Sequence, residues 1–363
     1  MTDTPAGAES RSEQYSKFIA SQQKNDPGSI FKLNDDAVAN VQVIPTGVIG
    51  LDIALGVGGL PRGRIVELFG PEMSGKTSLA LAVAAEAQKM GGFVGVIDAE
   101  HAFSRDFAVK AFGIDETRLA LAQPDDGIAG LQMVEKMCES KAFDVIIVDS
   151  VAALIPPAMA ENAIGEANQL GQHAKMMSDG LRKLTPVVAN SRAVVIMVNQ
   201  IRMNPTAYGN PEVTTGGRAL PFYASVRIEV RSPASKRLLD GKIPVGQTCS
   251  IKIKKNKVAP PHRETSYDLY YESGIAREAS LIEAAEKMEV ITRAGASYTE
   301  VATGERIAVG KEQVKEVLKT DDAMRVRLEK AVWEAAGLVP PTPPTPKESV
   351  VEAVSDVELT EEV

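Results

Sequence analysis

The chain has 363 residues, 44% hydrophobic and 24% charged, which suits a globular protein with one large domain plus appendages, or with two domains. No apolar run reaches the roughly 18–20 residues of a membrane span, and the polar N-terminus lacks the apolar core of a secretory signal. Two distant cysteines and three histidines offer no zinc-ligand spacing. We therefore expect a cytoplasmic protein with reduced thiols and no membrane partner.

The net charge of −8 is unevenly distributed. From Lys347 onward there are six carboxylates and one lysine, whereas Arg202–Lys257 holds eleven basic and three acidic residues. The chain therefore combines a basic region with a separate acidic tail, and its overall acidity does not exclude a nucleic-acid partner. A solvated basic face without a ligand is the alternative.

In chain order, residues 1–38 are expected to form an N-terminal region with a short helix near Ser12–Gln23. This helix packs either on its own domain or on a neighbouring subunit, as a polymerisation element. Strands and helices then alternate to about residue 270. Continuous apolar runs predict four buried strands of a mostly parallel α/β sheet, at Ile65–Phe69, Gly92–Asp98, Asp144–Ser150 and Ala193–Gln200.

The remaining segments alternate between apolar and polar residues, or carry turn residues. Val226–Val230 and Ser250–Val258 predict antiparallel strands at one side of the sheet. Pro156–Gly171 and Arg202–Gly217 are long loops, of a length that is usually functional. Residues 272–336 predict a small α+β domain with helices near Ser280–Met288 and Lys311–Lys319. Residues 337–363 predict a disordered, proline-rich acidic tail.

The string GPEMSGKTS fits the phosphate-loop pattern GxxxxGK[ST], with a strand before it and a helix after it. Backbone amides and the helix N-terminus attract phosphate, Lys76 neutralises phosphate oxygens, and the Thr77 hydroxyl ligates Mg²⁺. The sequence therefore predicts binding of ATP with Mg²⁺. The residues of this nucleotide site are Gly70, Pro71, Glu72, Met73, Ser74, Gly75, Lys76, Thr77 and Ser78.

Polar residues end three of the predicted strands, where a parallel sheet presents groups to nucleotide. Glu100 is the candidate for activating the hydrolytic water, and its alternative is a solvated strand-end charge. Asp149 suits an acid that contacts Mg²⁺ through water, and its alternative is a helix cap. Gln200 precedes the basic loop and is a candidate sensor of the γ-phosphate, although an ordinary strand-end glutamine is equally consistent.

Several strings together resemble the bacterial RecA recombinase family over roughly residues 12–336: PTGVIGLDIALGVGGLPRGRI, IDAEHAF, IIVDSVAALIP, VNQIRM and KIKKNKVAPP. The resemblance implies a RecA-type P-loop ATPase core at residues 39–271 that forms helical filaments on single-stranded DNA. It also implies DNA-dependent ATP hydrolysis, strand exchange with homologous duplex DNA in recombination and repair, and stimulated self-cleavage of an SOS repressor. A ring-forming motor of the same fold and an ATP-gated scaffold are the alternatives.

The resemblance also assigns roles to single residues. Glu100 corresponds to the catalytic glutamate and Gln200 to the γ-phosphate sensor, and Phe107 to the ring that stacks on adenine. Lys255 and Lys257 correspond to a pair that reaches a neighbour's ATP, and Phe222 to an interface aromatic. The two long loops correspond to DNA-binding loops. The DNA contacts expected in and near them are Lys175, Arg182, Arg202, Gly216, Gly217 and Arg218.

The chain departs from the family's pattern at several positions. Met73 replaces a small residue of the phosphate loop, Ser104 replaces an acid that contacts adenine, and Pro221 replaces an interface lysine. The loop at 156–171 is one residue longer than usual, and that at 202–217 is one shorter and lacks a bulky aliphatic residue. Such departures would suit a divergent, phage-encoded member.

Overall fold

The computed structural model describes residues 10–25, 30, 32, 41–160, 171–203 and 212–341. The expected disordered tail and the centres of both expected DNA-binding loops lie largely outside these residues. The chain divides into two compact units, residues 1–42 and 43–363. The first holds the expected helix, α1 (Arg11–Asn25). Ser10 and Glu13 form a reciprocal capping box at its start, which fixes where the helix begins.

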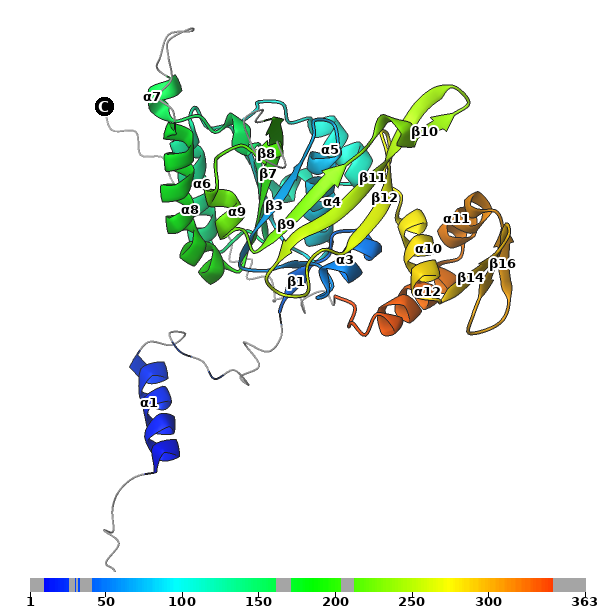
Figure 1. The fold of residues 1–363 in the computed structure, drawn as a ribbon, viewed down its shortest axis with the longest axis horizontal. Coiled ribbons are helices and arrows are strands. Elements are labelled where there is room, and N and C mark those ends of the chain that lie inside the picture. The colour runs from blue at the N-terminus through cyan, green and yellow to red at the C-terminus, as the bar shows by residue number, and fades with distance from the viewer. Residues whose placement is uncertain are drawn as a thin grey trace, which may run out of the picture. The chain divides into compact units, whose positions relative to one another are not determined.

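The second unit is built on one large sheet with the strand order β13-β12-β11-β9-β3-β7-β6-β4-β5 (Figure 1), in which β13 is the short edge strand Gly274–Ile275. All four predicted strands are present, and β5, which was not predicted, forms one edge. The parallel strands are β3 (Arg64–Gly70), β4 (Val94–Asp98), β5 (Leu119–Ala122), β6 (Val145–Asp149), β7 (Val194–Met203) and β9 (Val226–Arg231).

The antiparallel expectation for Val226–Val230 is confirmed for its pairing with β11 and wrong for its pairing with β3. This segment, β9, runs parallel to β3, and the chain reverses only at β11 (Ile243–Asn256), followed by β12 (Glu264–Tyr270). The alternation that suggested an exposed strand comes from Arg227 and Glu229. Both are engaged in ion pairs within the sheet, so the polar positions of β9 do not mark a solvent face.

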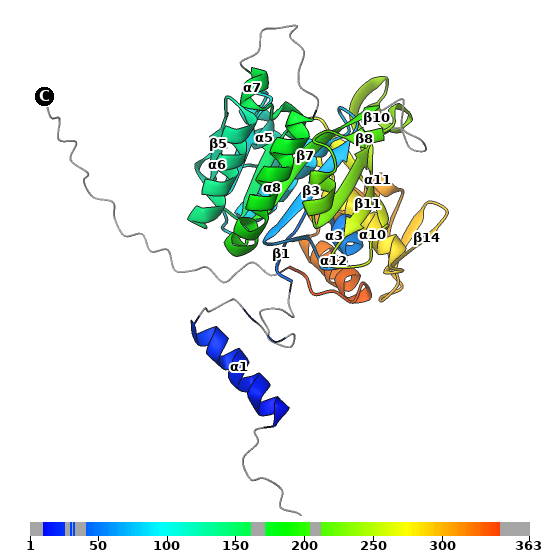
Figure 2. The same ribbon diagram turned by 60° about the vertical axis from the view of Figure 1, so that its left-hand side comes forward.

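Helices cover both faces of the sheet (Figure 2), as the continuous apolar strands predicted. On one face, Val66 and Leu68 of β3 join the core formed with α3 (Ile49–Leu55) and α4 (Lys76–Lys89). On the other face, Ile65 belongs to the core formed with α6 (Gly127–Ser140), α8 (Gln172–Ser191) and α9 (Ala219–Tyr223). Alternate side chains of one strand thus anchor opposite helical layers.

The C-terminal part combines three helices with a three-stranded antiparallel sheet, β14 to β16 (Ile291–Ala294, Ser297–Glu300 and Arg306–Val309). Helices α10 (Arg277–Lys287) and α11 (Lys311–Thr320) match the prediction, whereas α12 (Asp322–Ala335) was not anticipated. Its N-cap is Asp321, which accepts from the Met324 amide, and Trp333 joins it to the local core. Ile53 of α3 belongs to the same core.

The described ends of the two long loops are more regular than expected. The first begins with a short helix, α7 (Pro157–Ala160), and residues 161–170 lie outside the described part. In the second, β7 continues to Met203 and pairs antiparallel with β8 (Glu212–Thr214). Arg202 therefore lies on a strand rather than in a loop. None of the described helices is long and apolar enough to cross a membrane.

Candidate functional site

The phosphate-loop string connects β3 to α4, as its sequence required. Two glycines make this path possible. A side chain at Gly70 would approach the Val230 carbonyl oxygen to 2.0 Å, and Gly75 has a φ of +94° just before α4 begins. Buried Ser74 has a hydroxyl with no hydrogen-bond partner among the described residues. The two glycines let the loop pack closely on β9 and β11, and the unsatisfied Ser74 hydroxyl within it fits a phosphate group.

Lys76 is folded onto the loop that carries it. Its ammonium donates to the Pro71 carbonyl at 2.6 Å and to the Gly70 carbonyl at 3.2 Å. Burial lowers the pKa of Lys76, while the nearby carboxylates of Asp149, Glu100 and Glu72 oppose that shift. A bound phosphate would supply stronger, charged acceptors than these two carbonyls, so the lysine is positioned to transfer to it.

Thr77, in the first turn of α4, faces Asp149 at the end of β6. The Thr77 hydroxyl donates to the Asp149 carboxylate at 2.6 Å. Burial raises the pKa of Asp149, Glu100 raises it further, and the bond from Thr77 lowers it. Hydroxyl and carboxylate oxygens are the ligands that a hard divalent cation prefers, so this pair fits Mg²⁺.

Glu100 follows the end of β4 and accepts two hydrogen bonds on one oxygen. The Ser150 hydroxyl and the Gln200 side-chain amide, the latter at 3.1 Å, both donate to Oε1. Register explains this meeting, because Asp98 pairs with Asp149 and Gly70 pairs with Gln200 in the parallel ladders. The strand ends that carry Gln200 and Glu100 thus lie on the same side of β3, with the end of β6 and Ser150 between them.

Asp98 shapes the turn that presents Glu100, a role that the sequence analysis did not assign. Its buried carboxylate accepts from the amides of Ala102 at 3.2 Å and Phe103 at 3.0 Å, and from the Gln123 side chain at 3.0 Å. These bonds outweigh burial and lower the pKa of Asp98. A carboxylate at the end of an apolar strand was the signal that could have identified it.

A cavity of about 160 Å³ extends from Thr77, Glu100 and Asp149 to Phe107 on α5 (Arg105–Phe112). The expected adenine ring partner therefore lines the same cavity as the metal and catalytic candidates. Ser104 also lines it, and its hydroxyl accepts from the Phe107 amide at 3.3 Å as the N-cap of α5. The serine thus has a local structural function where the family places an acid.

Asn199 connects this site to the stem of the second loop, and no sequence pattern pointed to it. Its side-chain amide donates to buried Glu67 at 2.9 Å and to the Thr215 carbonyl at 3.0 Å. Its side-chain oxygen accepts from the backbone amide of Gln200 at 2.9 Å. Since Thr215 precedes the Gly216–Gly217 pair, Asn199 holds the γ-phosphate sensor candidate and the loop stem in one hydrogen-bonded unit.

The candidate DNA contacts lie around the start of α8. Gly216 and Gly217 pack against Met177 and Ala174 of that helix, with ideal Cβ positions 3.4 Å and 3.0 Å away. The exposed residues of this group are Lys175, Arg182, Arg202, Gly217 and Arg218. Arg182 lies two turns further along α8 and pairs with Asp179 at 2.8 Å. The glycine pair thus lies against α8, the helix that also carries Lys175 and Arg182.

The candidate interface residues form a separate group at the end of α9. The Lys255 ammonium donates to the carbonyls of Pro221 and Phe222, both at 2.8 Å. The Phe222 ring is 72% exposed, and Lys257 is exposed beside it. Burial lowers the pKa of Lys255, as do Lys257 and Arg227. Lys255 thus contacts the end of α9 instead of the phosphate loop of its own chain, and the Lys257 backbone amide donates to the Ser225 carbonyl at 2.9 Å.

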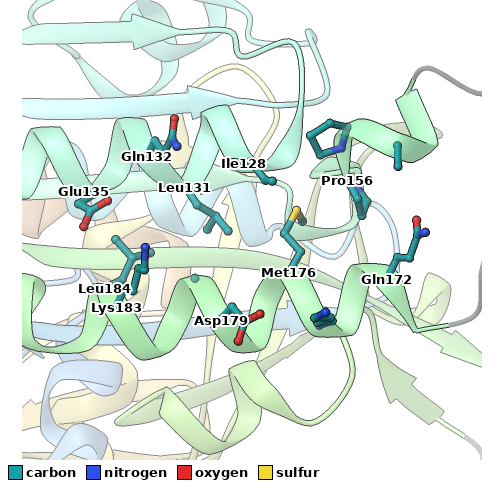
Figure 3. A pocket seen from close by; sticks show the side chains of 14 residues that line it. Ile128, Leu131, Gln132, Glu135, Pro156, Gln172, Met176, Asp179, Lys183 and Leu184 are labelled. Atoms are coloured by element: carbon teal, nitrogen blue, oxygen red, sulfur yellow. The ribbon is translucent and has the colours of Figure 1, made fainter.

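A larger hollow of about 560 Å³ lies between α6 and α8 (Figure 3). Its walls include Ile128, Leu131, Met176 and Leu184, and Lys175 and Asp179 are at its rim. Its walls are mainly apolar, and none of the nucleotide-site residues lines it. We therefore place the chemistry at the smaller cavity beside the phosphate loop.

In this parallel sheet a phosphate loop follows one strand, and an acid lies at the end of another. This arrangement defines the class of P-loop ATPases. The chain matches the RecA N-terminal domain over residues 17–276 and the RecA C-terminal domain over residues 279–337. The chain belongs to the RecA family. It is a nucleotide-binding, DNA-dependent ATPase and DNA recombinase, of a family that binds DNA and forms filaments.

Individual relatives are similar in sequence to this chain over most of their length. The chain is 44% identical over 335 residues to the protein RecA of Nitratidesulfovibrio vulgaris, covering 92% of each chain. It is 45% identical over 313 residues to that of Geobacter sulfurreducens, covering 86% of this chain and 91% of the relative. It is 46% identical over 323 residues to protein RecA 2 of Myxococcus xanthus, covering 88% of each.

Proposed function

We propose that the chain polymerises as a helical filament on single-stranded DNA and exchanges that strand with homologous duplex DNA, using ATP and Mg²⁺. The supporting observation is that neighbouring residues of β7 reach both places: the Gln200 side chain donates to Glu100, and the Asn199 side chain bonds the Gln200 backbone amide and the Thr215 carbonyl. These bonds link the proposed site of hydrolysis to the glycine pair that packs on α8. A path of this kind couples nucleotide state to DNA binding when its members have two alternative arrangements.

Within the nucleotide site we assign roles by chemistry. Lys76 and the loop amides hold the phosphates, Thr77 ligates Mg²⁺ and Asp149 contacts it through water. Glu100 orients the hydrolytic water, and Gln200 exchanges its bond with Glu100 for one with the γ-phosphate. Mg²⁺ would supply charge neutralisation between the phosphates. Phe107 stacks on the base.

We further propose that ATP joins subunits. Lys255, Lys257 and Phe222 are presented at the end of α9, where they can meet a second copy of this chain. The proposed division of labour is polymerisation by residues 1–38, ATPase and DNA binding by 39–271, and a small domain at 272–336. A tail at 337–363 follows. The filament would act in the cytoplasm and stimulate self-cleavage of an SOS repressor.

DNA recognition is proposed to be independent of sequence. Lys175, Arg182, Arg202 and Arg218 carry exposed charges, and the Gly216–Gly217 amides can approach a phosphate closely. Such contacts release counterions, so affinity falls as salt rises.

Strand exchange between a circular single strand and a linear duplex, with and without ATP, tests the proposal. We expect joint molecules only with ATP, and ATP turnover that rises with single-stranded DNA and falls with salt. A rate of ATP turnover that does not change when single-stranded DNA is added would contradict the proposal. Electron microscopy that shows closed rings instead of open filaments would favour the ring-forming motor.

A further inference from the structure

The phosphate loop lies against β11, a strand distant from it in sequence. Gly75 has three close neighbours on this side: an ideal Cβ there would meet Cys249 Sγ at 3.0 Å, Leu269 Cδ2 at 3.2 Å and the Tyr267 hydroxyl at 3.6 Å. Cys249 belongs to β11 and pairs in register with Tyr267 of β12. The outer side of the loop is thus supported by the antiparallel part of the sheet.

Two side chains of β11 bond the loop's carbonyl oxygens. The Gln247 amide donates to the Met73 carbonyl at 2.9 Å, and the Cys249 thiol donates to the Ser74 carbonyl at 3.4 Å. Cys249 is fully buried and free, and burial raises its pKa to about 11. It therefore remains a protonated thiol, able to donate, at neutral pH.

Because peptide groups are planar, these two contacts also determine where the amides of the loop point. In a planar trans peptide, the carbonyl of one residue and the amide of the next point in opposite directions. With the Met73 and Ser74 carbonyls held toward β11, the amides of Ser74 and Gly75 point away from β11. Within the described part of the chain, neither amide donates to a protein acceptor.

Met73 makes this support necessary. Its φ is +57°, a left-handed conformation that a residue with a side chain adopts at a cost. Its side chain is 85% exposed and contributes little packing to hold that conformation. The Gln247 bond acts on the carbonyl of this same residue, so it stabilises the peptide orientation that the cradle requires.

We propose that Gln247 and Cys249 are positioning residues of the nucleotide site, which hold the Ser74 and Gly75 amides toward the phosphates. The inference rests on the proposed binding of ATP at this loop. Neither side chain needs to touch the nucleotide. They act through the loop backbone, and their effect should therefore depend on the number of phosphates in the ligand.

Nucleotide titration of the full chain provides the test. Gln247→Met keeps the length of the side chain and removes the donor, and Gln132→Met on α6 is the matched control. We expect Gln247→Met to weaken ATP binding about three- to tenfold, as for loss of one hydrogen bond. AMP binding should change less than about twofold, because AMP lacks the β- and γ-phosphates. Cys249→Ala should follow the same pattern, and Cys249→Ser, which keeps a donor, should restore affinity.

Kinetics give a second readout. With single-stranded DNA, KM for ATP should rise with the Kd while kcat at saturating ATP stays near the wild-type value. Unchanged ATP affinity in Gln247→Met and Cys249→Ala would overturn the inference, and so would equal losses for ATP and AMP. If the wild-type chain itself bound no ATP, the proposed function would fail as well, so the two failures are distinguishable.

Discussion

Gln200 donates its side-chain amide to Glu100 Oε1 at 3.1 Å, so the candidate γ-phosphate sensor directly contacts the candidate catalytic base. The Ser150 hydroxyl donates to the same oxygen. In this arrangement two donors hold the glutamate. Binding of ATP would offer Gln200 a competing, charged acceptor, and its departure would free Glu100 to bind water.

Replacing Glu100 by Gln is expected to abolish hydrolysis while preserving nucleotide binding. The amide keeps the shape and still accepts from Ser150, but it cannot take a proton from water. We expect DNA-stimulated turnover to fall at least about 100-fold and ATP affinity to stay within about twofold. Steady-state turnover and equilibrium titration check this. A variant that hydrolyses ATP normally would remove Glu100 from the chemistry, and full recombination activity without hydrolysis would favour the scaffold alternative.

Replacing Gln200 by Ala is expected to uncouple ATP hydrolysis from the binding of single-stranded DNA. ATP should bind nearly as in the wild type, since Lys76 and the phosphate loop are untouched. The ratio of turnover with single-stranded DNA to turnover without it should fall toward one. Gln132→Ala on α6 is the matched control and should retain the full ratio. Normal DNA stimulation in Gln200→Ala would show that the loop senses nucleotide by another route.

Asn199→Ala is expected to destabilise the fold and also to weaken the coupling between the nucleotide site and the stem of the second loop. It leaves buried Glu67 with one donor fewer and the Thr215 carbonyl without its side-chain partner. Each such loss costs about 1–3 kcal/mol. Urea unfolding should therefore show a loss of about 2 kcal/mol or more. Asn190→Ala, at an exposed position of α8, should change stability by no more than about 0.5 kcal/mol. Equal effects of the two substitutions would contradict the role given to Asn199.

Asp52 predicts a pH dependence of stability. It is only 3% exposed, accepts from the Thr46 amide at 2.9 Å, and burial raises its pKa from 3.8 to about 8. The folded state therefore binds the proton more tightly than the unfolded state. The resulting stabilisation is complete below about pH 3.8 and is lost as the pH rises toward 8.

Asp52→Asn keeps the acceptor oxygen without the ionisation. The unfolding free energy of the variant relative to wild type should therefore rise steadily between about pH 5 and 8. Urea titrations at several pH values measure this difference. Asp125→Asn, at an exposed position, is the matched control. A difference that did not grow with pH for Asp52→Asn would show that its carboxyl is not held neutral by the fold.

Local patterns in the sequence determined the nucleotide-binding loop, the four central strands and the acids at their ends. They did so because glycine spacing and continuous apolar runs each have one common structural meaning. The direction of β9 and the presence of α12 were not determined in this way. Arg227 and Glu229 look like exposed positions until their ion-pair partners on other segments are known.

The tertiary structure decided which polar residues meet. The register that places Gly70 beside Gln200 and Phe69 beside Asn199 brings together segments more than a hundred residues apart, and no local pattern specifies it. The same holds for Gln247 and Cys249, which read as ordinary strand residues but reach the carbonyls of Met73 and Ser74. The sequence alone identified the candidate groups for binding phosphate, and only the packing of β11 revealed the side chains that we propose to orient them.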